Sequence, residues 1–104
     1  MKLLRWGAAL GLAGTVGAAW AAGQPDPNLV RNLAATCANC HGTDGRSVAG
    51  AGNESLAGTD KDTLMQKLRD FRSGTRPATI MHQISRGYTE AQLELIAAYF
   101  AARK

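Results

Sequence analysis

Five consecutive residues, Cys37-Ala38-Asn39-Cys40-His41, combine the residue types best suited to chemistry in this sequence. Two thiols separated by two residues and followed at once by an imidazole form C-x-x-C-H, the attachment signature of a c-type haem. The spacing puts the sulfurs about one helical turn apart, where they can add to two neighbouring vinyl groups of the porphyrin. His41 then lies under the ring centre, where it can bind the iron. The motif predicts one covalent haem c on Cys37 and Cys40.

Three other uses of the two cysteines fit the sequence less well. A structural zinc site needs four ligands, and His82 is the one further histidine or cysteine in the chain. A redox-active C-x-x-C pair of the thioredoxin type accompanies a βαβ pattern, and the chain shows no strand-like alternation. A simple disulfide leaves the adjacent His41 unexplained.

The N-terminus has the three parts of an export signal. Positive charge comes first, in residues 1–5, and residues 6–19 form an uncharged, largely apolar run. Ala19 and Ala21 supply the small residues that a signal peptidase requires, so we expect cleavage after Ala21, with Ala22 as the alternative. The run contains four glycines and is shorter than the roughly 20 apolar residues of a membrane span, and no cysteine stands at the cleavage site. The sequence predicts a signal peptide at residues 1–21 and an exported, soluble protein without a stable membrane anchor, in the periplasm.

The remaining residues, 22–104, are enough for one small domain. A core of this size alone contributes only a few kcal/mol, about 3–5, so a covalently held cofactor fits the need for extra stabilisation. Loss of Lys2 and Arg5 with the leader lowers the formal net charge from +4 to +2. Because nucleic-acid-binding domains carry a dense basic patch, we expect no nucleic-acid partner.

Hydrophobic spacing and capping signals predict an all-α domain with about four helices and no internal repeat. A first helix begins near Asn28 and leads straight into Cys37; a second is capped by Thr59 or Asp60 and stopped by Gly74. Pro77 opens a short helical segment to Arg86, and Thr89 to Gln92 form a capping box for the last helix. The predicted buried residues of the second and last helices are Leu64, Met65, Leu68, Phe71, Leu93, Ile96, Ala97 and Phe100. The basic residues Lys61, Lys67, Arg69 and Arg72 are expected to form a solvated face of the second helix.

Residues 42–58 are rich in glycine and small polar side chains. Following the haem-binding histidine, they predict a loop whose backbone approaches the porphyrin edge. A metal-ligating histidine usually donates its second ring N–H to a carbonyl or carboxylate. We therefore expect a backbone carbonyl of this loop to accept a hydrogen bond from His41.

The sixth position of the iron separates the function classes. A second strong ligand favours electron transfer, whereas an open position favours ligand binding or catalysis. The candidates are Met65, Met81 and His82. Met65 lies in a leucine stripe, where methionine usually fills the core, and His82 fits an exposed position on a short helix. Met81 has no such stripe to explain it.

The order of these features resembles that of small bacterial class I cytochromes c. Several stretches, residues 55–58, residues 71–79, Met81 and residues 87–88, are similar to the haem subunit of flavocytochrome c sulfide dehydrogenase. The resemblance covers residues 33–100. It implies a small class I cytochrome c fold around one haem, axial ligation of the iron by His41 and Met81, and a crossing of the first and last helices.

These features predict a periplasmic electron-transfer protein that carries one electron and has no catalytic residues of its own. Its partners are then redox proteins, among them the flavoprotein subunit of a sulfide-oxidising enzyme that this chain would serve as electron-accepting subunit. Two alternatives stay open: a free-standing soluble cytochrome that shuttles between respiratory complexes, and a gas-binding haem protein with an open sixth position.

Overall fold

The computed structural model describes residues 23–104, so the predicted signal peptide, residues 1–21, lies outside the described residues. Within residues 23–104 the elements are helices, turns and loops, with no strand. They follow in the order α1 (Pro27–Ala35), α2 (Ala38–His41), the 3-10 turn η1 (Thr43–Gly45), α3 (Lys61–Ser73), α4 (Met81–Arg86) and α5 (Glu90–Ala101). The prediction of an all-α domain is confirmed, with one short helix more than expected.

The extra helix arises at the cysteine motif. Helix α1 begins at Pro27, where a missing N–H costs nothing, and the Asp26 side chain caps it by accepting from Asn28 N at 2.9 Å. The helix does not lead straight into Cys37, because Cys37 N bonds to Ala34 O at 3.1 Å in a tightened turn. Thr36 and Cys37 keep right-handed helical dihedrals, and the chain re-enters a helix at Ala38, so the motif lies in the short helix α2 and the turn before it.

Helix α3 has the boundaries that its end signals predict. Of the two predicted caps, Asp60 is the one used, and it accepts from Thr63 N at 3.0 Å. Gly74 ends the helix in the left-handed conformation at φ 81°, which glycine adopts without steric cost.

The segment after α3 corrects one prediction. Helix α4 begins at Met81, and Pro77 lies in the irregular segment before it. Gln83 N and Ile84 N both bond to Ile80 O, at 2.9 and 3.1 Å, so Ile80 is the residue at the helix boundary. Residues 77–80 therefore form an irregular connection that ends at Met81.

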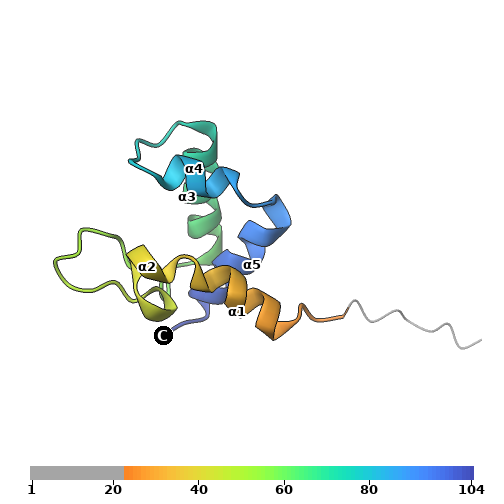
Figure 1. Ribbon diagram of the computed structural model, residues 1–104. Helices are drawn as coiled ribbons and strands as arrows, with labels where there is room; N and C mark the ends of the chain where they lie inside the picture. Colours follow the sequence, from red (N-terminus) through yellow and green to blue (C-terminus); the bar gives the residue numbers. More distant parts are fainter. Residues whose placement is uncertain (1–22) are drawn as a thin grey trace, which may run out of the picture.

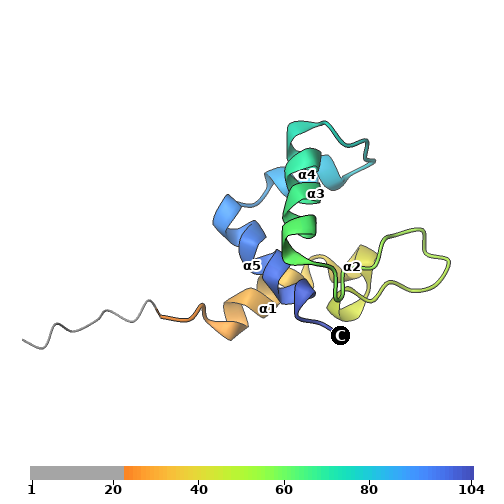
Figure 2. The ribbon, with the colours of Figure 1, turned by 180° about the vertical axis from the view of Figure 1, so that it is seen from behind.

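Helices α1 and α5 pack against each other at the foot of the domain, and α3 and α4 lie together at its other end (Figures 1 and 2). Helix α5 joins the two ends because it contacts both α1 and α3. The buried core comprises Ala34, Leu64, Met65, Leu93, Ile96, Ala97 and Phe100. Leu68 and Phe71, predicted to be buried with Leu64, are half-buried instead.

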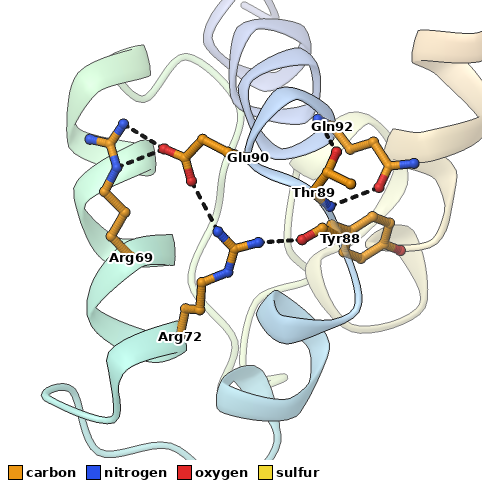
Figure 3. Close-up of polar contacts among 6 residues, drawn as sticks. All are labelled: Arg69, Arg72, Tyr88, Thr89, Glu90 and Gln92. Atoms are coloured by element: carbon orange, nitrogen blue, oxygen red, sulfur yellow. Dashed lines mark hydrogen bonds and ion pairs between the residues drawn. The ribbon is translucent and has the colours of Figure 1, made fainter.

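Charged side chains fasten α3 to the start of α5. Figure 3 shows Glu90 accepting from Arg69 Nε at 2.9 Å and from Arg72 at 3.0 Å, while Arg72 also donates to Tyr88 O. The predicted capping box is present beside them, with Gln92 N bonded to Thr89 Oγ1 at 3.1 Å and Thr89 N to Gln92 Oε1 at 2.9 Å. Three of the four basic residues of α3, Lys61, Arg69 and Arg72, therefore pair with acidic residues of α5. Lys61 and Arg69 are exposed as expected for a solvated face, whereas Lys67 and Arg72 are half-buried.

Candidate haem site

A cavity of about 310 Å³ opens between α2, the loop of residues 46–58, α3, and the segment that leads into α4. Its lining includes Cys37, Cys40, His41 and Met81, the four residues predicted to bind the haem. The first three come from α2 and the turn before it, and Met81 is the first residue of α4. The fold thus gathers side chains 40 positions apart in sequence around one space.

The walls of this cavity are largely apolar. Leu64, Leu68 and Phe71 of α3, with Ile96 and Phe100 of α5, line it from the core side. This explains why Leu68 and Phe71 are only half-buried, since they face the cavity. Apolar walls with a few placed polar groups are typical of cofactor sites, whose volumes run from about 300 to 1,000 Å³.

The imidazole of His41 is fixed by a backbone contact. Its Nδ1 lies 2.6 Å from Glu54 O, and a carbonyl can only accept, so Nδ1 carries the proton and donates. Nε2 is left as the nitrogen with a free lone pair, the form in which histidine binds a metal. The predicted carbonyl contact is confirmed, and Glu54 is the residue that provides it.

The other two candidate ligands lie elsewhere. Met65 is 3% exposed and belongs to the core, as its position in the leucine stripe predicts. His82 is half-buried on α4, and the described residues that line the cavity do not include it. Of the three candidates, Met81 is the one beside the cavity.

Cys37 and Cys40 are not joined in a disulfide in the described structure, and burial raises the pKa of the Cys37 thiol above its ordinary value of 9.0. The Thr36 hydroxyl opposes that shift and the neighbouring Cys40 adds to it. Cys37 is therefore protonated at neutral pH, whereas a redox-active C-x-x-C pair needs a thiol whose pKa is lowered. The raised pKa of Cys37 disfavours the thioredoxin alternative.

Tyr88 and Thr36 join the cysteine segment to the α4–α5 connection. Thr36 Oγ1 donates to Leu33 O at 2.9 Å, so the Tyr88 hydroxyl donates to Thr36 Oγ1, at 2.7 Å. Sequence patterns did not predict this contact, because 52 positions separate its residues.

The family model for cytochrome c matches residues 30–103. The chain belongs to the cytochrome c family. Membership implies a covalently attached haem c, for which the C-x-x-C-H segment of this cytochrome provides both cysteines. Paired thiols, an imidazole with a free Nε2 and apolar walls all fit that group.

Three curated relatives resemble this cytochrome. The cytochrome subunit of sulfide dehydrogenase from Chlorobaculum tepidum is 40% identical over 68 residues, 65% of this chain and 60% of the relative. The thiosulfate dehydrogenase electron acceptor of Stutzerimonas stutzeri is 39% identical over 69 residues, 66% of this chain and 32% of the relative. Cytochrome c4 of Pseudomonas aeruginosa is 36% identical over 91 residues, 88% of this chain and 44% of the relative. The chain thus spans between about a third and three-fifths of the length of these relatives.

A tyrosine–aspartate contact fastens the turn after the haem-binding motif. Tyr99 O–H donates to Asp44 Oδ1 at 2.6 Å, and Asp44 has a left-handed backbone at φ 54°. This hydrogen bond lowers the pKa of Asp44 below its ordinary value of 3.8 and raises that of Tyr99 above 10.0. The guanidinium groups of Arg103, Arg46 and Arg31 lower the pKa of Asp44 further, against the opposing effect of burial.

Replacement of Tyr99 by phenylalanine is therefore expected to lower the melting temperature in a pH-dependent way. A carboxylate with a lowered folded-state pKa stabilises the fold above its unfolded pKa, 3.8, and this stabilisation is lost as the pH falls through the folded-state value. Thermal unfolding of the parent and of Tyr99→Phe should differ at pH 7 and converge in acid. A difference that stays constant down to the acid limit would show that the hydrogen bond does not depend on the Asp44 charge.

Proposed function

We propose that this chain is a one-electron carrier whose haem is attached through Cys37 and Cys40 and ligated by His41 and Met81. The observation that carries the proposal is the single apolar cavity that all four side chains line. A haem c bound there supplies a ferric–ferrous couple. The His41 imidazole and the Met81 thioether would hold the iron, and this pair of ligands would give it a higher reduction potential than two histidines.

The residues of the chain act on the site without proton transfer to a substrate. Glu54 O holds the His41 ring in the tautomer that leaves Nε2 free, and apolar side chains of α3 and α5 form the cavity walls. The start of α4 fixes Met81 on the side of the cavity formed by residues 77–81. An iron with both axial positions filled would change its charge with little reorganisation, because no ligand has to be gained or lost.

We further propose that the electron donor is a sulfide-oxidising flavoprotein, with this chain as its cytochrome subunit. The support is the likeness to the Chlorobaculum tepidum protein, which is named as the cytochrome subunit of sulfide dehydrogenase. The second candidate is a free-standing carrier between respiratory complexes, and the likeness to cytochrome c4, whose name mentions no larger enzyme, is consistent with it. Co-purification of the natively expressed chain separates them: a flavin-containing partner supports the subunit, and a lone cytochrome that is reduced by other donors supports the shuttle.

Export to the periplasm belongs to the same proposal, with residues 1–21 as the cleaved leader and 22–104 as the cytochrome domain. In the part of the chain that the structure describes, every helix is too short or too polar to cross a membrane.

One measurement on the exported protein tests haem attachment and processing together. The intact mass after denaturation in acid acetone is expected to equal that of residues 22–104 plus one haem, because thioether bonds survive extraction. The variant in which both Cys37 and Cys40 are serine is the control, and it should lose its haem to the solvent. Extraction of the haem from the unmodified protein would disprove covalent attachment, and a chain beginning at Met1 would disprove cleavage.

A further inference from the structure

Glu54 contacts two different elements at once. Its backbone oxygen accepts from His41 Nδ1 at 2.6 Å, and its carboxylate forms an ion pair with Lys67 of α3. The residue that orients the imidazole is thus itself tied to a helix on another side of the cavity.

The loop around Glu54 has few other ties. Its base is closed by Gly45 O, which accepts from Ser55 Oγ, Leu56 N and Ala57 N at 2.8, 2.8 and 3.1 Å. Apart from Glu54, residues 47–54 form one hydrogen bond in the described structure. It closes a turn within the loop, from Ala51 N to Val48 O. Residues 48–54 are all exposed. The Glu54 carboxylate is therefore the one side chain of this stretch with an ion pair or hydrogen bond to the body of the domain.

Helix α3 is a firm anchor for that tie. Leu64 and Met65 are buried in the core on one side of Lys67, and Arg69 and Arg72 bind Glu90 on the other. The Lys67 side chain is 22% exposed and lines the cavity, so it moves less freely than a surface lysine. The Glu54 side chain is 56% exposed, so salt screens the pair from that side, and Lys67 is the better-shielded partner.

We propose that the Glu54–Lys67 ion pair is a positioning contact for His41. By fixing Glu54 against α3, the pair keeps the Glu54 carbonyl within hydrogen-bond range of Nδ1. A firm hydrogen bond at Nδ1 makes the imidazole a stronger donor through Nε2, which favours the ferric state. The inference rests on the proposed function in so far as His41 is an iron ligand.

Two single variants of the haem-bearing protein, Glu54→Ala and Lys67→Gln, test the contact. Both are expected to speed exchange of the His41 ring N–H with solvent several-fold in the nuclear magnetic resonance spectrum. Both are also expected to shift the reduction potential upward, because either change frees the carbonyl. A purely electrostatic role gives opposite signs: loss of a negative charge raises the potential, and loss of a positive charge lowers it. Opposite shifts with unchanged N–H exchange would overturn the proposal.

The Lys61–Glu94 pair, at 3.9 Å between α3 and α5, provides a matched control. Lys61→Gln and Glu94→Ala should leave the His41 N–H exchange at the parent rate. If exchange in these variants is as fast as in Glu54→Ala and Lys67→Gln, loss of any surface ion pair loosens the domain and the proposal is wrong. The charge-swapped double variant Glu54→Lys with Lys67→Glu should return exchange toward the parent rate, and a double variant as fast as the single ones would refute the pairing. The haem content of every variant is measured as well. If every variant keeps its covalent haem, a negative result refutes the role of the ion pair and leaves the proposed function untouched.

Discussion

Replacement of Met81 by alanine is expected to abolish the weak near-infrared sulfur-to-iron absorption band of the ferric protein and to open the ferrous protein to carbon monoxide. The reduction potential should fall, because a thioether is the ligand that raises the potential of a histidine-bound haem. Met81 is the expected ligand since it alone of the three candidates lines the cavity in the described structure. Absorption spectroscopy of the oxidised protein and carbon monoxide titration of the reduced protein measure the two effects.

Two control variants make this test specific. Met65→Ala should keep the band and lower stability by about 2–5 kcal/mol, the cost of truncating a buried methionine. His82→Ala should leave the spectrum unchanged. A silent Met81→Ala, with loss of the band in Met65→Ala or His82→Ala, would place the ligand elsewhere. Ready binding of carbon monoxide by the unmodified protein would favour the gas-binding alternative.

Replacement of Gly45 by alanine is expected to cost more stability than the same replacement at Gly50. Gly45 has a φ of 77°, and an added Cβ would lie 2.6 Å from Phe100 Cδ1 and 3.0 Å from Ala57 N. Phe100 is fully buried and cannot move aside. The left-handed backbone costs roughly 1–2 kcal/mol for alanine, and the overpacked contact adds about 1–3 kcal/mol. The sum is a large share of the roughly 5–15 kcal/mol that stabilises a domain.

Gly50 is the matched control, because its φ of 80° is nearly the same and no atom lies within 4 Å of an added Cβ. Gly50→Ala should therefore show the backbone cost alone. Each kcal/mol lowers the melting temperature of a domain this size by about 4–8 °C, so thermal unfolding resolves the two variants. Equal losses would mean that the Phe100 contact at Gly45 relaxes without cost.

The sequence determined those features that depend on neighbouring residues. The Thr89–Gln92 capping box, the Gly74 stop and the buried stripe of α5 follow from local spacing, and each is present as predicted. The C-x-x-C-H segment is equally local: its chemistry is complete within five residues. It even indicated that a loop carbonyl would meet His41, because a metal-ligating imidazole needs a partner for its second nitrogen.

Tertiary structure alone decided which distant groups meet. The path of a glycine-rich loop, whose conformation no periodicity encodes, made the Glu54 carbonyl the acceptor for His41 and brought the Glu54 carboxylate to Lys67. The contacts of Asp44 with Tyr99 and of Thr36 with Tyr88 span 55 and 52 positions. The start of α4 at Met81, rather than at Pro77, was also decided by the fold. The first hydrogen bonds of the helix go to Ile80 O, although a proline is a common first residue of a helix. Local patterns specify a helix by the free energy of neighbouring residues, whereas these contacts depend on how the packed helices bring separate segments of the chain together.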